Sequence, residues 1–189
     1  MTELKNIRKS FGDNVVLENF SLNLTQGSRN VIVGASGCGK TTLLRIIAGL
    51  ESVDGGEMLR DEKIAYMFQE TRLLPWKNAL DNVRAVLKKE NFALADKYLS
   101  AVGLADAEKK FPHELSGGMA QRVAFARFLA FAESTEADLL LLDEPFSALD
   151  KETAAKMLEL LKIFSVGKTL LLVTHDECDL AFADNIIKL

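Results

Sequence analysis

The sequence is poor in cysteine, in basic clusters and in long apolar runs. Its 189 residues include two cysteines, Cys38 and Cys178, which are too few for a disulfide framework and fit a reducing cytosol. The formal net charge is -4 and no segment is rich in lysine or arginine, which disfavours a nucleic-acid partner. Apolar stretches such as Leu139–Leu142 are far too short to cross a bilayer, and the first residues lack a signal-peptide pattern. At a membrane, such a chain depends on a partner to hold it there.

The composition, with 48% hydrophobic and 26% charged residues, predicts one globular domain with a sizeable core. Short apolar segments alternate with segments of helical periodicity, which favours an α/β fold with a largely parallel sheet. A polar, helix-like middle section predicts a sub-lobe inserted into that core. We expect strands at 16–24, 31–33, 63–68, 139–142, 169–173 and 185–189, helices at 41–50, 151–163 and from about 118, and the sub-lobe at about 78–110.

A glycine-rich segment between a predicted strand and a predicted helix fits the pattern G-x-x-x-x-G-K-[ST]. Its glycines let backbone N–H groups converge on phosphate oxygens, and the helix start adds partial positive charge. The alternative, a simple glycine turn before a helix, is rarely met with this spacing and context. The segment, here called the phosphate loop, consists of Gly34, Ala35, Ser36, Gly37, Cys38, Gly39, Lys40 and Thr41, with Thr42 following it.

Two residues of this loop have predicted roles in nucleotide chemistry. Lys40 is expected to reach the β and γ phosphates of a nucleotide. The hydroxyl of Thr41 is expected to ligate Mg²⁺, which prefers oxygen ligands. The loop therefore predicts ATP and Mg²⁺ as ligands.

Two carboxylates follow the apolar strand at 139–142. Asp143 is placed to support Mg²⁺, directly or through water, and Glu144 to hold and deprotonate an attacking water. Taken alone, the pair is equally well read as a charged turn at a strand end. The phosphate loop, expected at the same edge of the sheet, favours the catalytic interpretation.

A second glycine-rich helix start, Leu115-Ser116-Gly117-Gly118 followed by Arg122, also suits an anion. It resembles the LSGG-x-x-x-R signature of the ATP-binding cassette (ABC) family; a glycine N-cap on a surface helix is the alternative. The resemblance implies a P-loop NTPase fold with a mostly parallel sheet, a small antiparallel sub-sheet and an inserted helical subdomain. It divides the single domain 1–189 into a core of about 1–75 and 134–189 and a helical part of about 76–133.

The family resemblance covers most of the chain and implies further roles. In the family, the signature residues, here Ser116, Gly117 and Gly118, cap the γ-phosphate held by a second subunit, so a head-to-tail dimer is expected. Gln69 resembles the glutamine that touches Mg²⁺ and the attacking water. Asp150 resembles an acidic residue of the loop that crosses to the partner, His175 the histidine that contacts the γ-phosphate, and Phe11 an aromatic that stacks on adenine.

Three departures from the family pattern stand out. Position 120 is alanine, where relatives more often carry a polar or basic residue. The segment between Lys40 and Gln69 is compact, so the antiparallel sub-sheet is expected to be trimmed. The sequence ends soon after His175, so we expect no C-terminal regulatory domain.

The segment Leu73–Asn78 resembles the corresponding region of nitrate, sulfonate and taurine importer ATPases. This resemblance implies contact with an integral membrane permease near Gln69 to Trp76, at the cytoplasmic face of the membrane. Trp76 is equally well read as a cover on the helical lobe.

Three functions compete. The first is the ATPase of an ABC transporter, with import of a small anion or sulfonate-like solute favoured by the segment Leu73–Asn78. The second is a soluble ABC ATPase of DNA repair or translation, disfavoured by the charge and by the lack of a coiled-coil insertion or a tandem cassette. The third is a regulatory nucleotide-binding module without turnover, disfavoured by Glu144 and His175. In this family the ATPase does not touch the cargo, so no residue identifies the cargo.

Overall fold

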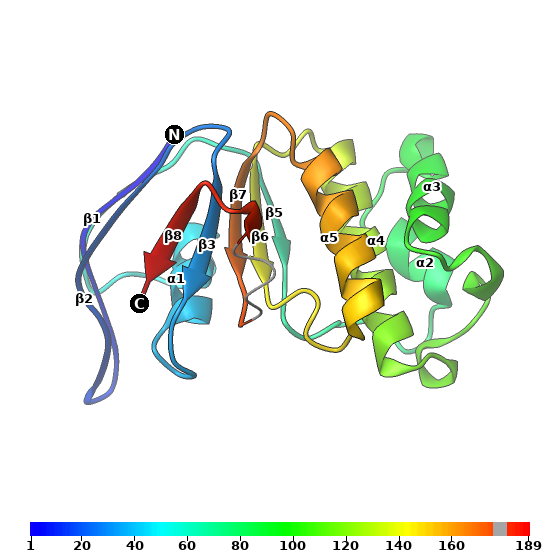
Figure 1. The fold of residues 1–189 in the computed structure, drawn as a ribbon, viewed down its shortest axis with the longest axis horizontal. Helices are drawn as coiled ribbons and strands as arrows, with labels where there is room; N and C mark the ends of the chain where they lie inside the picture. The colour runs from blue at the N-terminus through cyan, green and yellow to red at the C-terminus, as the bar shows by residue number, and fades with distance from the viewer. Residues whose placement is uncertain (176–180) are drawn as a thin grey trace.

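A computed structural model describes residues 1–175 and 181–189 of the chain. Two sheets lie side by side, and the helices cover the larger sheet and extend beyond it (Figure 1). Cys178, noted in the sequence, lies outside the described residues. Within the described ranges, no helix combines the length and the apolar character that a membrane span requires.

The smaller sheet is antiparallel. It contains β1 (Thr2–Phe11), β2 (Asn14–Leu24) and β4 (Gly55–Leu59) in the order β2-β1-β4. Leu17 and Leu24 of β2 are both buried although they are an odd number of positions apart, because the β1–β2 register shifts between them and Asn19 has a φ of +51°. This is the antiparallel sub-sheet expected from the family resemblance.

The larger sheet is parallel throughout its described ladders. Its order is β5-β6-β7-β3-β8, from β3 (Arg29–Val33), β5 (Ile64–Met67), β6 (Leu139–Asp143), β7 (Thr169–Val173) and β8 (Asn185–Lys188). All residues of β6 and β7 are buried, which explains their continuous apolar sequences. Because the strands are parallel, the loops after β3, β5, β6 and β7 leave from the same edge of the sheet.

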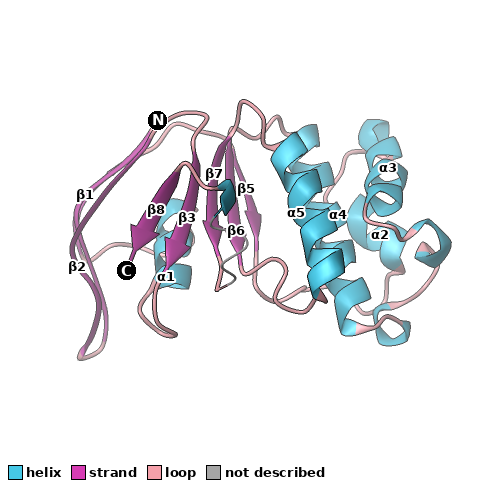
Figure 2. Cartoon of the chain, viewed as in Figure 1, coloured by secondary structure: helices cyan, strands magenta, loops and turns pink. Residues whose placement is uncertain are grey.

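The helices are α1 (Lys40–Ile47), α2 (Ala79–Arg84), α3 (Ala93–Ala101), α4 (Gly117–Ser134) and α5 (Lys151–Phe164) (Figure 2). Short 3₁₀ turns occur at Lys89–Asn91, Ala105–Ala107 and Pro112–Glu114. The helix predicted at 41–50 extends beyond the C-terminal end of α1 in the structure. It stops at Ile47 because the chain turns through Gly49, whose φ of +73° is left-handed.

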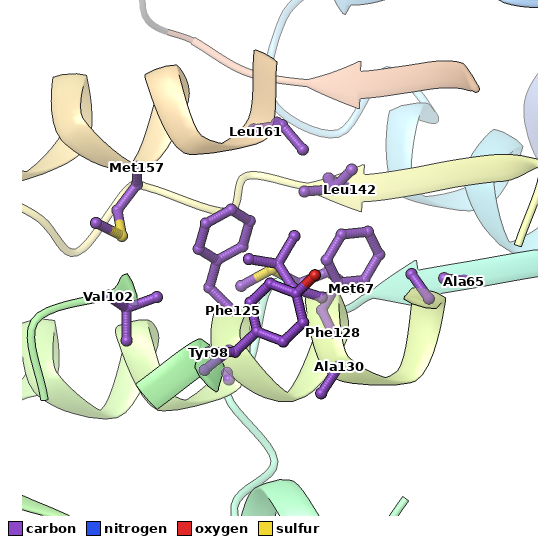
Figure 3. Close-up of a cluster of buried hydrophobic side chains, with 14 of the residues drawn as sticks. Ala65, Met67, Tyr98, Val102, Phe125, Phe128, Ala130, Leu142, Met157 and Leu161 are labelled. Carbon is purple, nitrogen blue, oxygen red and sulfur yellow. The ribbon is translucent and has the colours of Figure 1, made fainter. Parts of the chain in front are cut away.

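The inserted helices share one hydrophobic core with the parallel sheet. Figure 3 shows side chains from β5, β6, α3, α4 and α5 in a single cluster, with Phe125 and Phe128 of α4 near Leu142 of β6. Thus α4 packs on β5 on one side and on α2 and α3 on the other. The predicted subdomain limits at 76 and 133 remain a prediction, and α4 serves both parts.

Candidate functional site

The phosphate loop joins β3 to α1 and depends on glycine at two positions. A Cβ at Gly34 would lie 2.6 Å from the carbonyl oxygen of Leu189, at the end of the strand beside β3. Gly39 has a φ of +106°, and a Cβ there would lie 2.6 Å from Cγ1 of Val16. Both glycines are therefore required by the fold itself, in addition to any ligand.

Positive charge converges inside this loop. Lys40 is only 6% exposed, and its Nζ donates hydrogen bonds to the carbonyl oxygens of Gly34 at 2.9 Å and Ala35 at 2.8 Å. Gly39, the N-cap of α1, has no side chain to occupy the first N–H groups of the helix. Free amides beside an ammonium group are the donors that a phosphate group requires.

A pocket lies over the phosphate loop and extends to the carboxylates. Phe11 stands at its rim, 49% exposed, with Nζ of Lys9 4.9 Å from its ring centre. Sequence reasoning missed Val16, which lines the pocket from β2; nothing in its local pattern distinguishes it. The lining residues are Phe11, Val16, Ser36, Gly37, Gly39, Lys40, Thr41, Thr42, Gln69 and Glu144.

Asp143 ends β6 and is 1% exposed. The hydroxyl of Tyr66 donates to its Oδ2 at 3.4 Å, whereas Oδ1 is buried and accepts no hydrogen bond from the described part of the chain. Burial is the largest influence on the pKa of Asp143 and raises it; the nearby Thr41 hydroxyl opposes this, and the negative charge of Glu144 adds to it. A buried carboxylate oxygen beside the Thr41 hydroxyl is a suitable ligand pair for a hard cation.

Glu144 follows Asp143 with an uncommon backbone, φ +47°, held by its N–H donating to the carbonyl of Val173 at 2.9 Å. Its Oε1 lies 2.9 Å from Nε2 of His175, and its Oε2 accepts a hydrogen bond from Nε2 of Gln69 at 3.3 Å. The three predicted catalytic residues thus meet, from the loops after β5, β6 and β7.

The second glycine-rich helix start lies outside this pocket. The Oγ of Ser116 caps α4 by accepting a hydrogen bond from the N–H of Met119 at 3.2 Å. Ser116 and Gly117 are exposed, and a Cβ at Gly117 would meet nothing within 4 Å. Within the described ranges, no residue of Ser116–Gly118 lines the pocket around Lys40.

Asp150 also lies outside the pocket. Its side chain caps α5 by accepting hydrogen bonds from the backbone N–H and the hydroxyl of Thr153, and these bonds lower the pKa of Asp150. In this chain its visible role is that of an N-cap.

A second, mostly apolar groove lies between the loop after β5 and α4. It is lined by Tyr66, Met67, Phe68, Glu70, Thr71, Val86, Ala124, Arg127, Phe128 and Phe131. Arg127 fixes the loop by donating to the carbonyls of Thr71 at 2.6 Å and Arg72 at 2.9 Å. Trp76 is 70% exposed and so does not act as a buried cover on the helical lobe.

Comparisons with known proteins agree with this geometry. The sequence matches the family described as ABC transporter over residues 17–147. It is 45% identical to the aliphatic sulfonates import ATP-binding protein of Pseudomonas fluorescens and 47% identical to one from Rhodococcus jostii. The matches cover 97% and 92% of this chain, but only 71% and 65% of those relatives.

The fold also matches solved structures. A dimeric ATP-binding cassette in a post-hydrolysis state, bound to ADP and Pi, superimposes with a TM-score of 0.90 at 33% sequence identity. The match covers 100% of this chain and 94% of that chain. A second dimeric structure, of a bacterial ABC transporter cassette, gives a TM-score of 0.86.

Proposed function

Because this chain belongs to the ABC transporter family, we propose that it is the ATP-hydrolysing subunit that powers a membrane importer. The observation that carries the proposal is the position of Glu144, held between Gln69 and His175 at the edge of the pocket over Lys40. This arrangement joins a phosphate-binding loop to a carboxylate that can activate water.

ATP lies in the pocket over the phosphate loop. The N–H groups from Gly34 to Thr42 and the ammonium of Lys40 bind its phosphates, and Phe11 stacks on its adenine. The exposed ring of Phe11 at the rim, beside the Lys9 ammonium, supports that assignment.

The residues at the end of β6 fit Mg²⁺. Asp143 has one buried oxygen without a hydrogen-bond donor, and the hydroxyl of Thr41 and the amide of Gln69 line a small pocket with it. These three side chains would hold the ion through oxygen atoms. When bound, Mg²⁺ supplies positive charge that neutralises the phosphate oxygens.

Glu144 acts as the general base. It orients a water against the γ-phosphate and takes its proton as the new P–O bond forms and the bond to ADP breaks. Gln69 and His175 fix the two carboxylate oxygens, and His175 also contacts the γ-phosphate. Water thus becomes part of the released phosphate, with ADP as the leaving group.

Two copies of the chain close head to tail over two ATP molecules. The exposed N-terminus of α4, with Ser116, Gly117 and Gly118, binds the γ-phosphate held by the partner, and Asp150 lies at the same interface. Support comes from the open space around Gly117 and from the dimeric state of similar cassettes. ATP bridges the copies, so its binding favours the closed state.

An integral membrane permease binds beside the segment Gln69 to Trp76. The apolar groove between Phe68 and Phe131, together with the exposed ring of Trp76, offers a surface for a permease helix. The chain would then work as a peripheral protein on the cytoplasmic face of the membrane. The relatives named as aliphatic sulfonate importers favour a sulfonate or a similar small anion as cargo. No comparison favours the alternative role in DNA repair or translation.

The proposal is tested by purifying tagged Glu144→Gln protein from membranes of its own cell in the presence of Mg-ATP. We expect a polytopic membrane protein to be recovered with it in stoichiometric amount. Wild-type protein purified in the same way should release phosphate from ATP. Recovery of soluble proteins or nucleic acid alone would contradict the transport role. Absence of phosphate release by wild type would favour a regulatory module.

A further inference from the structure

The helix that begins with the signature residues lies along the loop that carries the catalytic base. Gly118, Gln121 and Phe125 follow one another at spacings of three and four, so they share one face of α4. This face lies against residues 144–149, the segment directly after β6.

At both ends of this face the helix lies close to the segment. A Cβ placed on Gly118 would lie 3.5 Å from the carbonyl oxygen of Ala148 and 3.5 Å from Cδ2 of Leu149, which is ordinary van der Waals contact. Phe125 meets Phe146 edge to face, with ring centres 5.4 Å apart. Close packing at both ends fixes the segment to the helix.

The middle contact is polar and buried. Gln121 is only 3% exposed, and its Nε2 donates a hydrogen bond to the carbonyl oxygen of Pro145 at 2.8 Å. Pro145 is the residue directly after Glu144. Burial of a side-chain amide costs desolvation free energy unless the amide makes a hydrogen bond. Here the hydrogen-bond partner is the backbone next to the catalytic carboxylate.

We propose that Gln121 is a positioning residue that transmits contact at Ser116–Gly118 to Glu144 of the same chain. The inference rests on the proposed head-to-tail dimer. There, the signature residues of one copy touch the ATP of its partner, while Glu144 of that copy serves its own ATP. The hydrogen bond from Gln121 to Pro145 therefore links the two ATP sites of the dimer.

The consequence is cooperativity between the sites. When ATP at the partner's site draws in the helix start of α4, the backbone after Glu144 moves with it, and Glu144 reaches its working position. Without the hydrogen bond, the two sites would be coupled only through closure of the dimer. Small displacements of a catalytic group lower the reaction rate strongly.

The test compares Gln121→Met with Val123→Ala. Methionine keeps the length and volume of the side chain but lacks the amide donor. Val123 is also buried in α4 but lies two residues on, toward a different face, so it controls for loss of packing. Three quantities are measured for each: ATP affinity of dilute monomer, turnover against ATP concentration, and the mass of the Glu144→Gln form with Mg-ATP.

We expect Gln121→Met to bind ATP within about twofold of wild type. Its turnover at saturating ATP should fall roughly 10- to 100-fold, and its Hill coefficient should fall below that of wild type, because one of the links between the two sites is lost. Val123→Ala should keep the wild-type Hill coefficient. Wild-type turnover and cooperativity in Gln121→Met, or an equal loss in Val123→Ala, would overturn the assignment.

Failure of the dimer itself gives a different result. The Glu144→Gln protein would stay monomeric with Mg-ATP, and wild type would show no cooperativity, which overturns the proposed dimer and this inference together. If Gln121→Met does not fold, Gln121→Asn replaces it. Asparagine keeps the amide but is one methylene shorter, so it cannot make the same bond to Pro145, and the same loss of cooperativity is expected.

Discussion

The chain contains two glycine-rich helix starts, and they differ in what surrounds them. At α1, Gly39 and Lys40 are buried, and the first N–H groups have no side-chain cap. At α4, Ser116 and Gly117 are exposed, and the Ser116 hydroxyl already caps the helix. The start of α1 is surrounded by a pocket, the Lys40 ammonium and carboxylates. The start of α4 presents its backbone to solvent.

This difference shows which part of the chemistry one copy can perform. The start of α1 is closed in by β2, the segment after β8 and the carboxylates at the sheet edge, so we expect it to bind a nucleotide in a single copy. The start of α4 has the same anion preference but no surroundings that would remove a phosphate from water. Its use requires a second surface, which the proposed dimer provides. Changes at the two starts should therefore separate binding from turnover.

The largest effect is expected beside the first start. Glu144→Gln removes the base but keeps the side-chain size, so turnover should fall roughly 10²- to 10⁴-fold. ATP affinity should remain, because Glu144 acts on water. Phosphate release and nucleotide binding check this, with Glu152→Gln on the exposed face of α5 as a control of equal chemistry. Wild-type turnover in Glu144→Gln would remove this residue from the mechanism.

Lys40→Met should weaken binding itself. The ammonium makes charge-assisted hydrogen bonds with phosphate, each worth about 1.5–3 kcal/mol, so affinity should fall roughly 10- to 100-fold. Titration of dilute protein with a fluorescent ATP analogue measures the change in affinity. Lys156→Met, on a solvent-exposed lysine, should bind as wild type does. Equal affinities for both variants would mean that the pocket over Lys40 is not the nucleotide site.

A matched pair of alanines compares the two starts directly. Gly39→Ala meets Val16 and a left-handed backbone, so it should cost about 1–3 kcal/mol of stability and impair binding by the monomer. Gly117→Ala meets nothing in its own chain, so stability and monomer binding should be kept. Its turnover should still fall about 10-fold, because the methyl group meets the partner's phosphate. Thermal melts, monomer titrations and turnover assays separate the two.

Equal stability, monomer binding and turnover in Gly39→Ala and Gly117→Ala would show that the two helix starts do not differ in function. In particular, full turnover in Gly117→Ala would show that no phosphate approaches the beginning of α4. A loss of monomer binding in the same variant would show that this helix start belongs to the first pocket.

The smallest effect is expected at the beginning of β3, the strand that leads into the phosphate loop. Asp184 accepts hydrogen bonds from the side chain and the backbone N–H of Arg29, which lower the pKa of Asp184 to about 2. Because the folded pKa lies below its ordinary value, the stabilisation is present above about pH 4 and is lost as the pH falls toward 2. The pair is partly exposed, so Asp184→Asn should cost less than about 1 kcal/mol at pH 7.

Urea denaturation of wild type and Asp184→Asn at pH 7, 5 and 3 checks this prediction. The gap between the two proteins should be constant from pH 7 to 5 and shrink at pH 3. ATP affinity should not change, since the pair lies at the start of β3, away from the phosphate loop. A gap that widens at low pH would have the wrong sign for this ion pair.

Local patterns in the sequence were sufficient to predict the strands of the parallel sheet and the glycine-rich loop between β3 and α1. Continuous apolar runs predict β6 and β7 because both faces of these strands are buried. The loop glycines predict a phosphate site because few other backbones allow that approach. Helix ends were less certain: the predicted helix from position 41 runs past Ile47, since its periodicity continues beyond the turn at Gly49.

Contacts between distant segments left no local signal. The Tyr66 hydroxyl on Asp143 and the Gln121 amide on Pro145 join residues far apart in sequence, and each residue alone looks like an ordinary strand or helix position. The sequence left Trp76 open as a cover or as a partner contact; its exposure excludes the cover, and the contact with a permease stays a prediction. The roles of Ser116–Gly118 and Asp150 came from family resemblance and remain predictions.

A second copy completes the proposed ATP site, and light scattering of Glu144→Gln protein measures whether it does. With Mg-ATP, we expect a particle of twice the monomer mass; with Mg-ADP we expect a monomer, and with Gly117→Ala added, a smaller fraction of dimer. A monomer in all conditions, with ATP bound at the expected affinity, would show that no second copy takes part.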